Sequence, residues 1–405
     1  MLREKFEAVR IVEILRSGIS SRYLANIFLY GREALLEAIQ QDLEAVAEGA
    51  LRTLILRGDY GEGKTHFLNA IFNLAQERNF AVSSVVLSKD TPFNRLDLVY
   101  PKLIAETYLP DTVEPGLEAL LRDIPPNSDM ALELMEFVRQ ELHPKIACVL
   151  ENYWQTPDSY HRYLLYNDLA GEWMPLKILR SLNQINFNKN VKLPKFIARQ
   201  GVWDYLRFWA YLIRARGYKG WVILFDEFEL VGALGVGGRG EAYCNLAHFI
   251  FPREGMAPES TFVVFSIASS FWTIHLLSER KPDLEKIPAW FISRGERQKA
   301  ELAKRAMNAL LQRSVTLSPL TAEKVQQLLS AIKDMHAYAY EWNPFIDMYE
   351  IAEKVKHDRL RTKIRYAIEY LDLKYLYQRE PQVVARAPEE ATLEELQEGI
   401  AEEND

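Results

Sequence analysis

Cysteine is scarce in this sequence, and long apolar runs are missing from it. The 405 residues include two cysteines, Cys148 and Cys244, which lie far apart. Two separated thiols exclude a disulfide framework and a cysteine-rich zinc site, and they suit a reducing compartment. No apolar run approaches the ~18 residues of a membrane-spanning helix, and the N-terminal segment mixes acids with bases, unlike a secretory signal. We therefore expect a soluble, cytoplasmic protein without a membrane partner.

Most of the chain has no excess of either positive or negative charge. The sequence is 48% hydrophobic and 26% charged, as in globular proteins, and its net charge is −7. From Ala387 onward it has eight acids and no base, so the residues before this point carry a net +1. This balance argues against a strongly basic protein that coats nucleic acid, although it permits a local basic surface. The length of the chain is a separate indication: 405 residues exceed what one hydrophobic core usually supports, so we expect two or three packed units.

Helix and strand patterns alternate in the first part of the chain. Apolar residues recur at helical spacing over 6–18 and 33–46, and each stretch ends near a glycine. A short apolar strand is expected at 53–56, followed by a glycine-rich loop, a helix and a β-branched strand at 80–87. This alternation predicts a parallel sheet with helices on its faces.

The pattern changes between residues 110 and 200. Helical segments there are separated by prolines and carry many aromatic residues, so we expect an α-helical insertion. Strand signals return at 221–225, 261–267 and 314–317. Residues 318–321 then resemble a helix start, and further helical pattern follows them.

A phosphate-binding loop is the clearest motif in the sequence. The pattern G-x-x-x-x-G-K-[ST] is matched at every required position, between a predicted strand and a predicted helix. Its glycines let successive amide N–H groups point at phosphate oxygens, and the following helix adds its positive end. The lysine is expected to bridge the β- and γ-phosphates, and the threonine hydroxyl to coordinate Mg²⁺. The motif residues expected to bind ATP are Gly58, Asp59, Tyr60, Gly61, Glu62, Gly63, Lys64 and Thr65.

Two further points concern this loop. A glycine turn that merely joins a strand to a helix is the alternative interpretation. Lys64 is also counted among the catalytic residues. His66 directly follows the motif and is counted with the ATP-binding residues, although helix packing or solvent exposure, without chemistry, is its expected role.

Two adjacent acids follow the predicted strand at 221–225. Asp226 can hold Mg²⁺ through water, and Glu227 can polarise the attacking water. A kinase needs no water-activating glutamate beside the metal-binding aspartate, so this pair favours ATP hydrolysis. Glu229 follows closely and can compete for either role. The alternative is a pair of solvated acids at a strand end.

Serines and arginines supply the remaining catalytic candidates. Ser269, with Ser266 behind it, can sense the γ-phosphate or hold the attacking water, and a serine turn is the alternative. An arginine that acts in trans would lie just before the last strand, and Arg297 is our candidate there; a second sensor would lie in the C-terminal helical unit, where Arg361 is our candidate. A solvated surface charge is the alternative for each. The arginines of the two groups are Arg294, Arg297, Arg305 and Arg313, and Arg359, Arg361 and Arg365.

Several motifs resemble those of known ATPases. The box Leu-Tyr-Gly-Arg-Glu at 29–33 is similar to the entry motif of origin-recognition-like and signal-transducing AAA+ ATPases, which contacts the adenosine side. This resemblance adds Gly31 and Arg32 to the ATP-binding residues. The segments at 14–18, 58–65 and 317–321 look more specifically like the ATP-binding proteins of BREX-type bacteriophage-exclusion systems.

The resemblance implies an architecture and partners. It implies an AAA+ core with a lid, a bacterial or archaeal origin, and action beside defence proteins such as a helicase, a methyltransferase or a phosphatase-like protein. AAA+ proteins often have threonine or asparagine as the first sensor, whereas this chain offers serine. The expected fold class is thus α/β, a P-loop NTPase of the AAA+ kind with a parallel sheet core, a large α-helical insertion and a C-terminal α-helical lid. The expected domains are a core in two parts (1–109 and 201–317), the insertion (110–200), the lid (318–386) and an acidic disordered tail (387–405).

Two functions remain open at this point. The first is a Mg·ATP-hydrolysing enzyme that loads or remodels a partner on DNA during phage defence, with a homo-oligomer as one expected form. The second is a nucleotide-dependent switch or scaffold with little or no turnover. Basic stretches at 189–199 and 354–365 can contact DNA without sequence specificity, and a solvated basic face is the alternative.

Overall fold

The structure is a computed structural model, and it describes residues 2–18, 20–110, 112–252, 256–280, 282–348 and 359–379. The predicted acidic tail at 387–405 and part of the basic stretch at 354–365 lie outside the described residues. The chain divides into two compact units according to the contacts between its residues. Unit 1 comprises Met1–Ile39, Leu56–Asn73 and Val315–Asp405, and unit 2 comprises Gln40–Ile55 and Leu74–Ser314.

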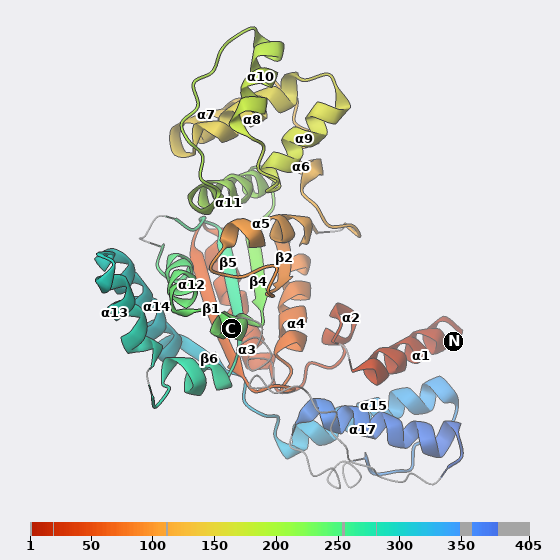
Figure 1. Cartoon of the computed structure of the whole chain (residues 1–405). Coiled ribbons are helices and arrows are strands. Elements are labelled where there is room, and N and C mark those ends of the chain that lie inside the picture. The colour runs from red at the N-terminus through yellow and green to blue at the C-terminus, as the bar shows by residue number, and fades with distance from the viewer. Residues whose placement is uncertain are drawn as a thin grey trace. The chain divides into compact units, whose positions relative to one another are not determined.

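A six-stranded, mostly parallel sheet is the main β-structure of the chain (Figure 1). Its strands are β1 (Leu51–Gly58), β2 (Ala81–Val86), β3 (Thr107–Tyr108), β4 (Trp221–Asp226), β5 (Thr261–Ala268) and β6 (Ser314–Thr316). Across the sheet they follow the order β3-β2-β4-β5-β1-β6. β4 pairs in parallel with both β2 and β5, with Val222 opposite Val82 and Ile223 opposite Val263.

The middle of the sheet is fully buried. Every residue of β4 and of β5 is buried, and both strands are nearly continuous runs of apolar residues. Such runs are typical of parallel strands, because helices cover both faces of the sheet. The α/β class and the predicted strands are confirmed, although β1 is longer than the segment 53–56 that the sequence indicated.

The predicted parallel sheet has an antiparallel pair at one edge. β3 pairs with β2 in the antiparallel direction, with Ser83 opposite Thr107, and the hydroxyl groups of these two residues are 2.6 Å apart. A strand of two residues is too short to show any periodicity in the sequence. It was therefore missed.

Aromatic rings pack against the sheet within unit 2. The ring of Phe93 lies edge-on to three other rings, with centroid distances of 5.4 Å to Phe225, 5.1 Å to Phe228 and 5.4 Å to Phe265. Edge-to-face pairs of this kind are worth about 0.5–1.5 kcal/mol each beyond the area they bury. Two of these rings, Phe225 and Phe228, flank the acids that follow β4 in the sequence, so the cluster fixes the backbone on either side of those acids.

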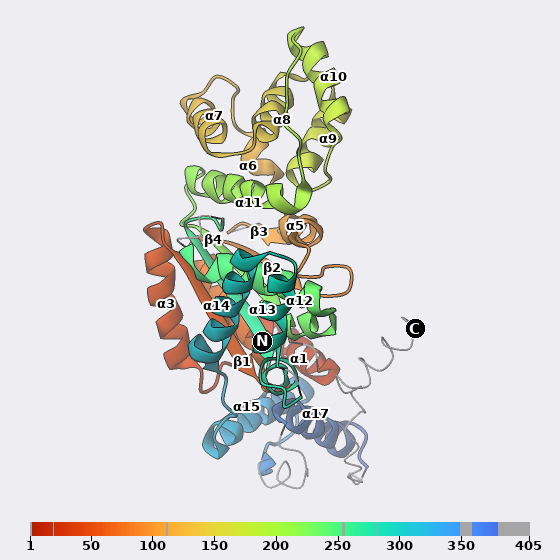
Figure 2. The same cartoon turned by 60° about the vertical axis from the view of Figure 1, so that its left-hand side comes forward.

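The helices of unit 2 form two groups. In both views, α6 to α10 gather on the side of α11 that faces away from the strands (Figures 1 and 2). α12, α13 and α14 pack against one another as a second group. The bounds are α5 Leu96–Ala105, α6 Glu118–Arg122, α7 Asp129–Glu141, α8 Pro144–Gln155, α9 Ser159–Leu169, α10 Leu176–Phe187, α11 Ala198–Ala215, α12 Val236–Ile250, α13 Asp283–Ser293 and α14 Arg297–Arg313.

The prolines and polar residues between these helices act as start signals. Pro144 occupies the first turn of α8, where its missing N–H costs no hydrogen bond. The side chain of Ser128 accepts from the N–H of Ala131 at the start of α7, and Asp158 accepts from His161 in the same way at α9. The sequence between 110 and 200 thus folds into separate short helices.

One ion pair in this helical group is completely buried. Lys145 Nζ of α8 lies 2.5 Å from Asp168 Oδ2 of α9, and both side chains are 0% exposed. Asp168 also accepts hydrogen bonds from the Tyr205 hydroxyl at 2.7 Å and from the Met174 N–H at 2.7 Å. Burial raises the pKa of Asp168 and lowers that of Lys145, while their mutual attraction opposes both shifts. Removing one partner would leave an uncompensated charge in the interior.

Unit 1 has a helical core of its own. Helix α1 (Leu2–Ser17) contacts both α15 (Ala322–Tyr340) and α17 (Leu360–Leu371), and α2 (Arg22–Ala25) is a single turn. α15 begins as the sequence predicted, with the Thr321 side chain accepting from the N–H of Lys324. Two further helices, α3 (Glu33–Ala47) and α4 (Lys64–Glu77), have residues in both units. Among the helices that the structure describes, none is both long enough and apolar enough to cross a membrane.

A polar network ties these helices together. Arg16 donates to both carboxylate oxygens of Asp372, each at 2.7 Å, and His336 Nε2 lies 3.0 Å from the same carboxylate. The indole N–H of Trp342 donates to His336 Nδ1 at 2.8 Å. Burial alone would raise the pKa of Asp372, but the hydrogen bonds from His336 and Arg16 outweigh it and hold this pKa below its ordinary value. Arg16, within the segment 14–18 of the resemblance, is therefore engaged by the C-terminal helices.

Candidate functional site

The phosphate loop connects β1 directly to α4 within unit 1. β1 ends at Gly58, and α4 begins at Lys64. Gly61 and Gly63 have φ angles of +82° and +90°, which side-chain-bearing residues rarely adopt. The loop glycines are thus needed for the backbone path, and the loop leads into the start of α4, the end of a helix that favours an anion.

Lys64 is nearly buried beside this loop. Its side chain is 8% exposed, and Nζ donates to the carbonyl oxygens of Gly58 at 3.0 Å and Asp59 at 3.2 Å. Nζ also lies 5.0 Å from the centre of the Tyr60 ring. A buried ammonium requires such partners. Its charge is therefore held at the loop itself.

The start of α17 lies against the same loop. The N–H of Arg361 donates to the Gly61 carbonyl at 3.3 Å. A methyl group built on Gly61 would lie 3.5 Å from Cβ of Arg359 and 3.6 Å from Cβ of Arg361. The structure thus brings the predicted second sensor Arg361 to the phosphate loop.

Gly31 and Arg32 also lie within unit 1. Gly31 has a φ of +68°, and Arg32 Nη2 donates to the Ser318 carbonyl at 2.6 Å. Burial lowers the pKa of Arg32, and the negative charge of Glu62 opposes this shift. Burial in turn raises the pKa of Glu62, and the charge of Arg32 opposes it. The two side chains thus interact electrostatically, which links the box at 29–33 to the phosphate loop.

One residue near the loop was missed as a candidate. Lys363 also acts on Glu62 through its positive charge. In the sequence, Lys363 was visible only as one base of the basic stretch at 354–365. The high density of bases there was the signal that could have pointed to Lys363 as a site residue.

His66 is half-buried and contacts the backbone of Phe28. Its Nε2 lies 3.0 Å from the Phe28 carbonyl, and burial lowers the pKa of the imidazole. A neutral ring that donates from Nε2 satisfies this carbonyl. This contact joins α4 to Phe28, which lies shortly after α2.

Asp226 and Glu227 lie at the end of β4 in unit 2. Asp226 is 5% exposed, and its Oδ1 accepts from the N–H of Glu227 at 3.0 Å. Glu227 has a φ of +59°, an uncommon angle for a residue with a side chain. Such backbone strain costs on the order of 1–3 kcal/mol and concentrates at functional sites. A short 3₁₀ helix, Phe228–Ala233, follows immediately.

Glu229 has a structural partner next to the sensor candidates. It is 2% exposed, and its Oε2 accepts from the N–H of Ala268, the last residue of β5, at 3.0 Å. Ser269 follows this residue and is half-buried, whereas Ser266 is 0% exposed inside β5. Glu229 therefore fixes the backbone from which Ser269 extends.

The arginines before β6 have different surroundings. Three of them face aromatic rings: the guanidinium of Arg294 lies 4.3 Å from the Trp290 ring, and those of Arg305 and Arg313 lie 4.3 Å and 5.3 Å from the Phe251 ring. Arg297 is exposed at the start of α14. Arg297 is thus exposed to solvent, whereas the other three arginines pack against aromatic side chains.

The predicted site residues therefore fall into two groups. The loop residues, His66, Gly31, Arg32 and Arg361 belong to unit 1, where the contacts above connect them. Asp226, Glu227, Ser269 and Arg297 belong to unit 2. In the described ranges, no three His, Cys, Asp or Glu side chains are grouped so that they could hold a metal ion. A divalent ion here would need oxygen atoms from a phosphate ligand and from water, which is how Mg²⁺ is commonly bound.

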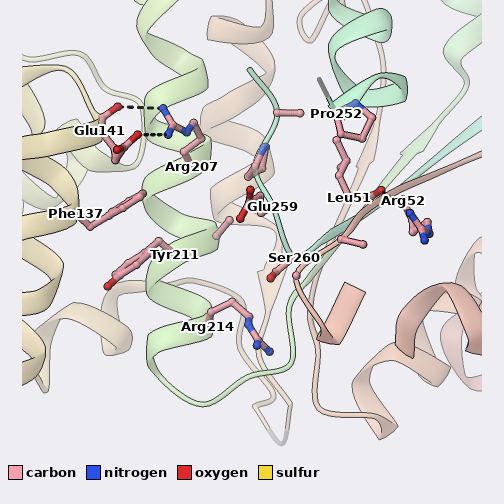
Figure 3. Close-up of a pocket in the computed structure, with 15 residues that line it drawn as sticks. Leu51, Arg52, Phe137, Glu141, Arg207, Tyr211, Arg214, Pro252, Glu259 and Ser260 are labelled. Carbon is pink, nitrogen blue, oxygen red and sulfur yellow. Dashed lines mark hydrogen bonds and ion pairs between the residues drawn. The ribbon is translucent and has the colours of Figure 1, made fainter. Parts of the chain in front are cut away.

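A cleft of about 760 Å³ in unit 2 is lined by none of these candidates. Its walls come from α7, α11, the start of β1 and the segment before β5 (Figure 3). Arg207 donates to the carbonyl and the carboxylate of Glu141, and Tyr211 stacks on Phe137 with ring centroids 4.0 Å apart. Three arginines and two glutamates line the cleft, so its charge is mixed, and Arg207 is already paired with Glu141.

Comparison with known proteins identifies one family. The family described as BREX system ATP-binding protein BrxC/D matches residues 4–123 and 128–368. These ranges include the phosphate loop, both acids after β4 and the start of α17. No curated protein matches the chain.

Proposed function

The chain belongs to the family of BREX system ATP-binding proteins, and from this premise we propose that it is a Mg²⁺-dependent ATP hydrolase of the P-loop, AAA+ kind that acts in bacterial or archaeal phage defence. The observation that carries the proposal is the loop between β1 and α4. There, two glycines with positive φ, the start of a helix and a nearly buried lysine occur together.

The loop would bind the phosphates of ATP. The N–H groups at the start of α4 donate to phosphate oxygens, and the positive end of the helix favours their charge. Lys64 exchanges the carbonyls of Gly58 and Asp59 for the β- and γ-phosphates, which are stronger acceptors because they are charged. Gly31 and Arg32 contact the adenosine side, as the resemblance implied.

Thr65 and Asp226 would hold Mg²⁺. A hydroxyl and a carboxylate provide hard oxygen donors, and the phosphates and water complete the coordination. The ion supplies charge stabilisation for the transferred phosphoryl group. These two residues belong to different units, so the proposal requires the end of β4 and the phosphate loop to meet around one nucleotide. The sheet order supports this, because β5 alone separates β4 from β1.

Glu227 would act as the general base. Its carboxylate takes a proton from a water molecule, whose oxygen forms a bond to the γ-phosphorus while the bond to the β–γ bridging oxygen breaks. ADP leaves with the electron pair of that bond. Ser269 orients the water, and Arg361, together with Arg297 from a second copy of the chain in a homo-oligomer, stabilises the developing charge.

The domain boundaries from the sequence extend this proposal. The AAA+ core would consist of 1–109 and 201–317, with 110–200 inserted into it and 318–386 as the lid. The contact of Arg361 with Gly61 supports a lid that responds to the nucleotide. We propose that turnover loads or remodels a partner, such as a helicase of the same defence system, on DNA.

A nucleotide-dependent switch with little turnover is the second candidate. Steady-state phosphate release, measured with and without DNA and partner, separates the two functions. The ATPase proposal predicts release that depends on Mg²⁺. Tight ATP binding by the wild-type chain with no release under any of these conditions would select the switch.

A further inference from the structure

Positive charge is concentrated in one segment of unit 2. Between residues 173 and 203 the chain has six bases and no acid. The whole chain carries −7, so without these six charges the remainder carries −13. The same segment contains six asparagine and glutamine residues. The six bases are Lys177, Arg180, Lys189, Lys192, Lys195 and Arg199.

Half of these bases lie on the connection from α10 to α11, which we call the basic strap (residues 188–197; Figure 1). The strap has no regular secondary structure, but two side chains of α10 hold its backbone. Arg180 Nη2 donates to the Leu193 carbonyl at 3.1 Å, and Asn183 Nδ2 donates to the Lys189 carbonyl at 2.8 Å. The Leu193 side chain is 8% exposed and belongs to the core of unit 2.

The aromatic residue of the strap points inward. The Phe196 ring lies 4.3 Å from Lys145 Nζ and 5.5 Å from the Trp173 ring. A methyl group built on Gly201 would approach within 2.1 Å of a Phe196 ring carbon, so the absence of a side chain at Gly201 makes room for this ring. The inner side of the strap is thus anchored by Leu193 and Phe196.

The cations of the strap point outward. Lys189, Lys192 and Lys195 recur at every third residue and are exposed, as is Arg199 in the first turn of α11. In the part of the chain that the structure describes, none of the four forms an ion pair with a carboxylate. An anchored backbone that presents free cations loses little conformational entropy on binding a polyanion.

We propose that the basic strap, together with Lys177 and Arg199, binds the phosphate backbone of duplex DNA. The regular lysine spacing complements a regular array of phosphates, and neighbouring amides such as those of Asn190 and Gln200 can donate to phosphate oxygens. Single-stranded DNA is disfavoured at the strap itself, because its binding sites stack bases on exposed aromatic rings and Phe196, the one aromatic residue of the strap, is packed inward. The proposal rests on the proposed function only in taking DNA as the partner.

The test is duplex binding by the full-length chain without nucleotide. A labelled 25-base-pair duplex is titrated by fluorescence anisotropy at several NaCl concentrations, using the wild type and the triple variant K189Q/K192Q/K195Q. The log–log salt slope is expected to fall by ~0.9 for each lost phosphate contact, which is up to about 2.7 for three. Affinity near 100 mM salt should fall by about tenfold or more.

A matched variant controls for net charge. K102Q/K219Q/K304Q removes three exposed lysines elsewhere in unit 2 and should bind the duplex as the wild type does, apart from a small uniform change. ATP binding is measured on all three proteins, so that failure of the phosphate loop is distinguished from failure of the strap.

Three results would overturn the proposal. They are no duplex binding by the wild type at 50 mM salt, equal losses in the two triple variants, and a polyglutamate peptide that binds more tightly than the duplex. The last result would assign the strap to an acidic protein segment instead.

Discussion

The phosphate loop and the basic strap are two regions for which we propose phosphate binding, and they are built in different ways. The loop uses backbone geometry, with left-handed glycines and the N–H groups at the start of α4. The strap uses lysine side chains on an irregular backbone that Leu193 and Phe196 anchor. Directed N–H groups fit one triphosphate in one orientation, whereas flexible ammonium groups fit any regular row of phosphates. The loop should therefore be selective and the strap tolerant.

The largest effect that separates the two regions is expected from Lys64→Ala. The variant loses charge-assisted hydrogen bonds to two phosphates, each worth about 1.5–3 kcal/mol, so ATP affinity should fall by about 100-fold or more. Duplex binding should not change. Isothermal titration with ATP checks the first expectation and anisotropy checks the second, with Lys304→Ala, an exposed lysine of α14, as the control. Equal losses of both activities would mean that the regions are not independent.

The strap is carried by the helices of its group, and Lys145→Met tests how strongly one buried ion pair stabilises these helices. This change leaves the buried carboxylate of Asp168 without its positively charged partner, which should cost about 3–5 kcal/mol of unfolding free energy in urea. The double change of Lys145→Met and Asp168→Asn should recover part of this loss, because no unpaired charge remains and the amide oxygen can still accept a hydrogen bond from Tyr205 or Met174. If the single variant is as stable as the wild type, the ion pair does not hold the group together.

The dependence of the loop on its backbone is tested by Gly61→Ala. An alanine at a φ of +82° should cost about 1–2 kcal/mol and weaken ATP binding about tenfold. Gly235→Ala is the matched control, because Gly235 has a φ of −60° and no atom within 4 Å of a built methyl group. Within the strap, Asn190→Ala should leave the fold unchanged, since the left-handed backbone angle of the strap lies at Asn188 (φ +52°) and Asn190 has no positive φ. Thermal melting measures the stability of each variant, and ATP titration measures its affinity for ATP.

Lowering the pH should reduce the folding stability near the end of β4 without changing duplex binding by the strap. His275 packs on Gly232 of the 3₁₀ helix that follows Glu227, and burial, aided by the charge of Arg239, lowers its pKa from 6.5 to about 4. The unfolded chain therefore binds this proton more tightly, and stability should decline as the pH falls from 6.5 towards 4. In His275→Gln this part of the decline should be absent, whereas duplex binding through lysines should be constant over the same range. Urea unfolding at several pH values is the measurement. An identical decline in the variant would assign it to other groups.

The comparison also explains what the sequence could predict. The phosphate loop is a contiguous motif whose spacing follows from its geometry, and the strands that carry it and Asp226 are apolar runs. Arg361 was named as one arginine among several, and only folding shows that its N–H reaches Gly61. The strap was visible as a basic stretch, but its outward lysines depend on contacts of Arg180 and Asn183 with its backbone, which no periodicity encodes. The two-residue strand β3 gave no signal.

The most direct test of the account is phosphate release by Glu227→Gln. The substitution keeps the size of the side chain and removes the proton acceptor, so ATP should bind as in the wild type while steady-state release from Mg·ATP falls by about 10²–10⁴-fold. Release at the wild-type rate by a variant that binds ATP normally would contradict the role of the acids at the end of β4.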